Sequence, residues 1–150
     1  MCNTNFFITD IETESINNKF YRKVLYTSNH QQLVLMSIKP KQKICYEIHK
    51  NNDQFIRIEK GHGIIVIGPK KECKFDLYPG VSVTVPQGTW HEIINTSDVE
   101  DLQLYTIYSP PHHPKNKIDM DGPATCNGNN NHHDHNNHSG YNNRNNRNKS

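Results

Sequence analysis

The feature that most constrains the fold of this chain is a series of short apolar segments between residues 33 and 108. Apolar residues in them recur mostly at every second position, which is the period of a strand with one buried face. Turn residues separate the segments, and no helical period interrupts the series. We therefore expect about eight strands, at residues 33–38, 44–49, 54–59, 64–67, 73–78, 81–85, 90–94 and 102–108. Regular short strands joined by Gly/Pro turns are typical of an all-β sandwich or barrel.

The segments on either side of this series carry weaker signals. Residues 19–26 could add one more strand, and residues 11–17 could form a turn of helix. Beyond the last strand, prolines at 110, 111 and 114 prevent its continuation because proline cannot donate a ladder hydrogen bond. We expect residues 115–126 to be extended and weakly ordered.

The last part of the chain differs from the rest in composition. From Asn127 onward it is almost entirely Asn, His, Gly, Arg and Ser, with no aliphatic residue. Such a segment cannot bury enough apolar area to offset its ordering entropy. We therefore assign residues 1–126 to one domain and residues 127–150 to a low-complexity, disordered tail. The tail's histidines could chelate a metal, but a soluble appendage explains its composition better.

The distribution of charge excludes two classes of partner. The tail accounts for the formal net charge of +2, because residues 1–126 contain 14 of the 17 basic and 14 of the 15 acidic side chains. A neutral domain offers no basic surface for nucleic acid. No apolar run approaches the roughly 20 residues that span a bilayer. We expect no nucleic-acid partner and no membrane partner.

The cysteines and the N-terminus indicate a cytoplasmic protein. Cys2, Cys45, Cys73 and Cys126 are scattered, with no Cys-x-x-Cys pair, so we expect reduced thiols and neither a disulfide nor a cysteine zinc site. Residues 1–15 contain acidic side chains and lack an apolar core, which does not fit a secretory leader.

Four polar residues on the predicted strands could form one metal site. Glu47 and His49 are two positions apart on one strand and so share a face. Gln54 returns beside them after a turn, and His91 follows a Pro-x-Gly turn that lets it approach from another hairpin. Two imidazoles, a carboxylate and an amide oxygen suit a divalent Zn, Fe, Mn or Ni ion. The alternative is a polar network without a metal.

One of these segments resembles a known family. The pattern Gly80-x5-Pro86-x-Gly88-x2-His91-x3-Asn95 is similar to the second motif of the cupin superfamily at every defining position. The likeness extends over roughly residues 15–120 and includes small single-domain cupins often labelled mannose-6-phosphate isomerase-like. It implies a double-stranded β-helix, which is a jelly-roll barrel, with a metal site inside its mouth. It also makes a homodimer plausible.

The first cupin motif is kept only in part. His49 and Gly61 fit the family's pattern. Lys41 stands where the pattern has a glycine, Glu47 replaces a histidine and Gln54 replaces a glutamate. Since Glu and Gln still offer oxygen, the resemblance implies an altered metal site with Glu47, His49, Gln54 and His91 as ligands.

The resemblance leaves three functions open. The first is a sugar or sugar-phosphate isomerase-like enzyme, in which a metal polarises a carbonyl. Phosphomannose isomerases are similar in using two His, one Glu and one Gln, but no inward-facing Arg or Lys clamp for a phosphate is evident here. The second is a non-haem iron dioxygenase-like enzyme using His49, His91 and Glu47. The third is a non-catalytic module that binds a metal or a small, polar, sugar-like molecule.

Several aromatic residues near these positions carry further predictions. Trp90 is expected in the core rather than in a pocket wall. Tyr105 and Tyr108 are an odd number of positions apart, so they should face opposite sides of their strand. One of His112 and His113 could lie over the barrel mouth, although a loop histidine without a ligand role is the commoner case.

Overall fold

The computed structural model of the protein describes residues 5–126. All eight predicted strands are present, each end lying within two residues of its expected position. The two weaker signals also correspond to real elements, a helix and an additional strand. The predicted tail at residues 127–150 lies outside the described part of the chain. The elements are α1 (Ile11–Asn17), β1 (Arg22–Thr27), β2 (Gln32–Ile38), β3 (Lys43–Glu47), β4 (Asp53–Lys60), β5 (Gly63–Ile67), β6 (Cys73–Leu77), β7 (Ser82–Val85), β8 (His91–Asn95), β9 (Leu102–Ser109) and β10 (Ile118–Asp119).

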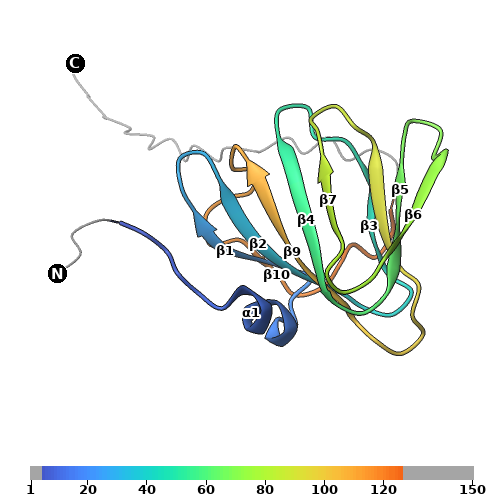
Figure 1. Ribbon diagram of the computed structural model, residues 1–150, viewed down its shortest axis with the longest axis horizontal. Coiled ribbons are helices and arrows are strands. Elements are labelled where there is room, and N and C mark those ends of the chain that lie inside the picture. Colours follow the sequence, from blue (N-terminus) through green and yellow to red (C-terminus); the bar gives the residue numbers. More distant parts are fainter. Residues whose placement is uncertain (1–4, 127–150) are drawn as a thin grey trace, which may run out of the picture.

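The strands form two antiparallel sheets that face each other (Figure 1). One sheet has six strands in the order β10-β1-β2-β9-β4-β7, and the other has four in the order β3-β8-β5-β6. The chain crosses repeatedly between the sheets, as when β2 leads to β3 and β8 leads to β9. The prediction of an all-β jelly-roll barrel is confirmed.

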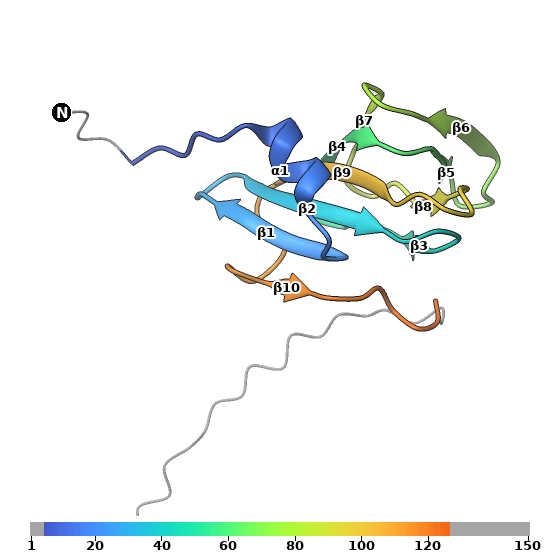
Figure 2. The same cartoon turned by 90° about the horizontal axis from the view of Figure 1, so that it is seen from below.

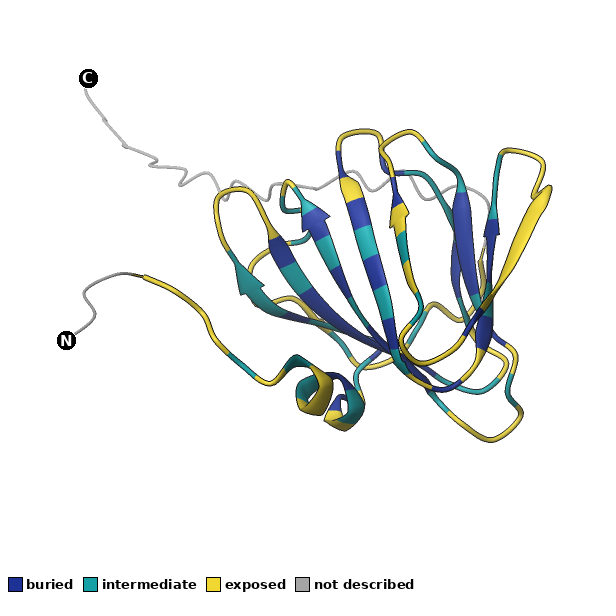
Figure 3. Ribbon diagram, viewed as in Figure 1, coloured by how far each residue is buried: buried dark blue, intermediate teal, exposed yellow. Residues whose placement is uncertain are grey.

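The space between the sheets is filled by alternating side chains. On β4, Ile56 and Ile58 are buried while Arg57 and Glu59 face outward and form an ion pair at 2.6 Å. The same alternation is visible as bands along β4 in Figure 3. Burial of aliphatic side chains at roughly 25 cal/mol per Å² is the main stabilising contribution. The core consists of Tyr21, Val24, Val34, Met36, Ile38, Ile44, Ile56, Ile58, Ile65, Leu77, Val85, Ile93, Leu102, Leu104 and Tyr108.

The helix α1 covers part of the outer face of the six-stranded sheet (Figure 2). The Asp10 side chain caps its N-terminus by accepting a hydrogen bond from the Thr13 amide at 3.1 Å. Gln103, on the outward face of β9, donates to the carbonyl oxygens of Ile16 and Asn18 at the other end. Within residues 5–126, no helix is long and apolar enough to cross a membrane.

A segment that we call the strap, residues 110–126, follows β9 and returns along the edge of the six-stranded sheet. Its short strand β10 pairs with β1 (Figure 2), and a disulfide between Cys45 and Cys126 ties its end to β3. The strap therefore connects the edge strands of both sheets. The prediction of reduced cysteines is wrong for this pair. Since 81 residues separate the two cysteines, only the folded path of the strap brings their Cα atoms to 5.4 Å.

Candidate metal centre

Two turns meet at one end of the barrel and position the predicted ligands. The turn between β3 and β4 and the turn between β7 and β8 both lie at the upper end in Figure 1. The Gly88 amide donates to the His49 carbonyl at 2.7 Å, and the Gln87 amide donates to Asp53 Oδ1 at 2.9 Å. Gly88 has φ +77°, a left-handed conformation that costs least for glycine. The glycine in the Pro-x-Gly turn therefore links the two motifs directly.

His91 is the most firmly positioned member of the site. It is the first residue of β8 and only 1% exposed. Its Nδ1 lies 3.0 Å from the Thr89 carbonyl, which can only accept, so Nδ1 carries the proton. Burial lowers the pKa of His91 and keeps the ring neutral. Its Nε2 therefore presents a lone pair to the interior, as a metal ligand requires.

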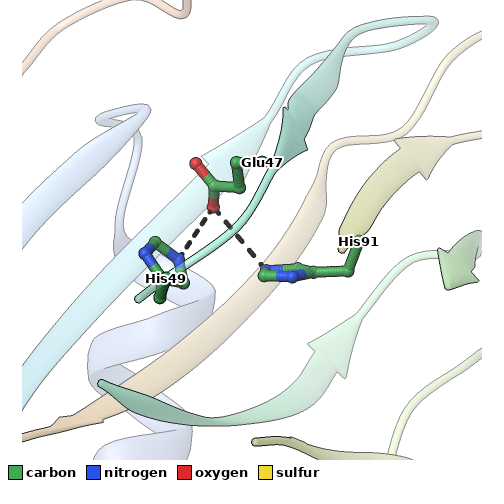
Figure 4. A group of neighbouring side chains, drawn as sticks. All are labelled: Glu47, His49 and His91. Atoms are coloured by element: carbon green, nitrogen blue, oxygen red, sulfur yellow. Dashed lines mark hydrogen bonds and ion pairs between the residues drawn. The ribbon is translucent and has the colours of Figure 1, made fainter. Parts of the chain in front are cut away.

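Glu47 reaches the site because of a bulge in β3. The pairing with β8 shifts between Ile44 and Glu47, which places Glu47 directly opposite His91. Glu47 Oε1 lies 3.2 Å from His49 Nε2 and 3.7 Å from His91 Nε2 (Figure 4). Burial raises the pKa of Glu47, but the hydrogen bond with His49 and the electrostatic interactions with His49 and Arg22 lower it more. The carboxylate is ionised, and 30% of the side chain remains exposed.

Gln54 completes the set with its amide oxygen. It is 1% exposed, and its Nε2 donates to Thr106 Oγ1 at 3.1 Å and to Tyr108 Oη at 3.2 Å. That orientation directs Oε1 toward His91 Nε2, at 3.0 Å. With the amide in this orientation and the His91 ring neutral, two acceptors face each other. A cation between the two atoms would resolve this contact.

The structure brings all four predicted residues together. Potential ligand atoms of Glu47, His49 and His91 lie within 4.8 Å of one another, and Gln54 Oε1 adjoins His91. Nitrogen and carboxylate donors in this number suit a borderline divalent ion. His49 Nε2 is within hydrogen-bonding distance of Glu47, so a metal would take the place of any proton shared there.

The rim of the site is aromatic. Tyr108 is buried and faces inward, and Tyr105 is on the other face against Phe55, so the prediction of opposite faces is confirmed. The exposed His112 ring lies 4.6 Å from that of His49, and its Nδ1 is 3.2 Å from Asn52 Oδ1. His112 does lie over the mouth.

The prediction for Trp90 is wrong. Trp90 is only half-buried and stacks on Tyr46, with the ring centroids 4.8 Å apart. Because Trp90 immediately precedes His91 on the chain, the inward orientation of His91 turns the Trp90 side chain away from the core.

Sequence reasoning missed Arg22. It is two positions from the buried Val24 on β1, and so shares its inward face. Its charge contributes to the lowered pKa of Glu47 and His113. Alternation along residues 19–26 was the signal that could have identified it, had the register of that strand been known.

A hollow in the surface lies away from this cluster. It is lined by residues that include His62, Asp76 and Tyr78, where β4 leads into β5. Within the described residues, the one group of three or more metal-binding side chains is at the mouth.

The fold and the cluster together define a class, a small jelly-roll barrel with metal-binding groups inside one end. The family model for the cupin domain matches residues 34–108. The chain therefore belongs to the cupin family, and the resemblance expected from the sequence is confirmed as a small single-domain cupin.

Similar proteins support this assignment. An uncharacterized protein, L612, of Acanthamoeba polyphaga mimivirus is 50% identical over 119 residues, covering 79% of this chain and 74% of that one. The uncharacterized protein YrkC of Bacillus subtilis is 41% identical over 111 residues, which are 72% of this chain and 59% of YrkC. The crystal structure of BH2720 from Bacillus halodurans has a TM-score of 0.75 and 35% identity, covering 79% of this chain and 91% of that one.

Proposed function

We propose that this cupin binds a divalent metal ion and holds a small polar molecule against it at the mouth of the barrel. The observation that carries the proposal is the convergence of acceptors. The His91 Nε2 lone pair, Gln54 Oε1 and the Glu47 carboxylate face one buried point from three strands. Without a cation these groups repel one another.

The donor set indicates which residues hold the ion. His49, His91 and Glu47 would supply two nitrogens and a charged oxygen, with Gln54 as a neutral fourth donor. Zn, Fe, Mn and Ni all accept such a set. When bound, the ion would polarise a carbonyl or hydroxyl oxygen of the ligand. The partly exposed Glu47 marks the side from which a small molecule would approach.

The proposal includes three candidate activities for the site. A sugar or sugar-phosphate isomerase-like activity is the first candidate, because two His, one Glu and one Gln resemble the ligands of phosphomannose isomerases. Oxidation chemistry is the second, since Glu47, His49 and His91 form a two-His-one-carboxylate set. A non-catalytic module is the third, because the same groups would hold a ligand without transforming it.

Two further predictions accompany the proposal. The first is a cytoplasmic location, where the Cys45–Cys126 disulfide would have to persist against cellular reductants. A homodimer could form through β6, an edge strand whose first four residues are exposed (Figure 3).

Metal content tests the proposal. The full chain should be purified with the tail histidines His132, His133, His135 and His138 changed to Gln, so that the tail cannot bind metal. Elemental analysis should then find about one transition-metal ion per chain. Less than about a tenth of an equivalent of transition metal per chain after reconstitution would contradict the proposal and favour a metal-free polar network. Turnover on phosphosugars, or on oxidisable small molecules, would separate the reaction classes, and no turnover would favour the binding module.

A further inference from the structure

Two buried polar atoms near the mouth have no hydrogen-bond partner. They are Nε of Arg22 and Nε2 of His113, and no other side-chain atom of the described residues has this status. Buried polar groups in proteins are almost always paired. Both atoms belong to segments that line the same side of the barrel, since β1 and the strap are adjacent. Their shared requirement is an acceptor or donor that the chain does not provide.

The guanidinium of Arg22 is anchored but only partly used. Its Nη1 pairs with Asp119 Oδ2 at 2.7 Å, and the strand register places these two residues opposite each other on β1 and β10. The group lies 5.4 Å from the centre of the Tyr21 ring. This anchoring leaves the Nε–H edge as a preorganised donor, which favours recognition of a planar or tetrahedral anion.

His113 is held beside it by its backbone. The His113 amide donates to Gln32 Oε1 at 2.8 Å, and its carbonyl accepts from Gln32 Nε2 at 2.7 Å. The ring packs edge-on against Tyr108 with centroids 5.1 Å apart. Burial, and next the charge of Arg22, lower the pKa of His113 to about 3, so the ring is neutral. In the neutral tautomer that carries its hydrogen on Nε2, the ring offers a single donor.

With a metal bound, the charges around these atoms favour an anion. Asp119 is shared, because Lys117 Nζ also contacts it, at 2.9 Å from Oδ1. The positive charges of Arg22 and Lys117 are balanced by Asp119 and the nearby Glu47. A divalent metal at the cluster would outweigh the single charge of Glu47 and leave an excess positive charge beside the site.

We propose that Arg22 Nε and His113 Nε2 form an anion subsite that binds a carboxylate or phosphate group of the small molecule held at the metal centre. This inference rests on the proposed function, and it narrows the ligand to a small acid. The acidic group sits on the β1 side of the mouth while an oxygen elsewhere in the molecule faces Glu47, His49 and His91. An anion there would accept hydrogen bonds from the two unpaired donors. Neutral sugars lack this contact.

Binding of matched ligands tests the subsite. The full chain with the four tail histidines changed to Gln is titrated calorimetrically with gluconate, glucose 6-phosphate and glucose. At least one acid should bind about tenfold or more tightly than glucose, and comparison of the two acids identifies carboxylate or phosphate. Arg22→Gln and His113→Phe should each remove most of that preference. The matched control Arg57→Gln, which removes a guanidinium from the outward-facing ion pair with Glu59, should keep it.

The readouts separate this inference from the metal proposal. Arg22→Lys preserves the charge without the Nε–H edge, so it should recover only part of the preference, and circular dichroism checks that each variant folds. Metal content is measured on the same samples and should be unchanged by Arg22→Gln. Equal affinity for acids and glucose in a metal-loaded chain would overturn the subsite alone and leave the two atoms bound to water. Arg22-dependent acid binding in a chain that takes up no metal would support the subsite and refute the metal centre.

Discussion

The two halves of the proposed metal centre are held in different ways. The half on β8 depends on a local turn, in which Gly88 has a positive φ and the Thr89 carbonyl orients the His91 ring. The half on β3 depends on distant parts of the chain, because a bulge aligns Glu47 with His91 and the disulfide at Cys45 ties the same strand to the strap. His91 is almost fully buried, while 30% of the Glu47 side chain is exposed.

This difference explains which motif the chain has kept. A Pro-x-Gly turn works only with particular residues at particular spacings, so the motif around His91 follows the family pattern closely. An oxygen from Glu47 can replace a histidine nitrogen as long as the bulge supplies the position. The half on β3 is therefore the one in which the ligand types differ from the family pattern.

The largest expected effect tests the tertiary anchor. Cys126→Ser removes the link between β3 and the strap, and a loop closed over 81 residues predicts a loss of about 4 kcal/mol in the free energy of unfolding. Urea denaturation without reductant measures the loss. Cys73→Ser, at an exposed free cysteine, is the control and should be neutral. Equal stability of the two variants would contradict a stabilising disulfide.

The next effect tests the local half. His91→Ala removes the lone pair that faces Gln54 and Glu47, and should weaken metal binding by at least about a hundredfold. Metal titration of the chain with the tail histidines changed to Gln measures this, with the exposed His62→Ala as the control. Comparable losses in both variants would show that the metal binds elsewhere.

A smaller effect is expected from the oxygens of the first motif. Glu47→Gln keeps the shape but removes the charge, so metal affinity should fall about tenfold. Gln54→Glu adds a charge that the Thr106 and Tyr108 hydroxyls can hydrogen-bond, so affinity should rise by a similar factor. The metal affinities of both variants are measured by the same metal titration as for His91→Ala. If Gln54→Glu leaves the affinity unchanged, Gln54 is not a ligand.

The smallest effect isolates the connection between the turns. Gly88→Ala and Gly80→Ala both place a side chain at positive φ, with no neighbouring atom within 4 Å of the added Cβ, so each should cost about 1 kcal/mol of stability. The Gly88 amide, unlike that of Gly80, donates to His49. Only Gly88→Ala should also weaken metal binding. A loss of metal affinity in Gly80→Ala of the same size would refute a specific role for the Gly88 turn.

Local pattern was sufficient for most of the fold and for part of the site. Strand period and turn residues predicted the eight strands, and the likeness to the cupin motifs predicted Glu47, His49, Gln54 and His91 as ligands. Strict alternation from Ile44 would have placed Glu47 on the opposite face, and the bulge that reverses this is invisible in a period-two pattern. Arg22 and His113 were missed as a pair because 91 residues of chain separate them.

The sequence by itself determined the all-β barrel and the turn that aims His91, since both follow from interactions between residues close along the chain. Only the tertiary structure decided that Glu47 and Gln54 face His91 and that Cys45 forms a disulfide with Cys126. It also decided that the positive charge of Arg22 lies near Glu47 at the mouth. The physical reason is register. Which strands pair, and at which residue, depends on how both sheets pack over the shared core, and one residue of bulge is enough to move a carboxylate from one face to the other.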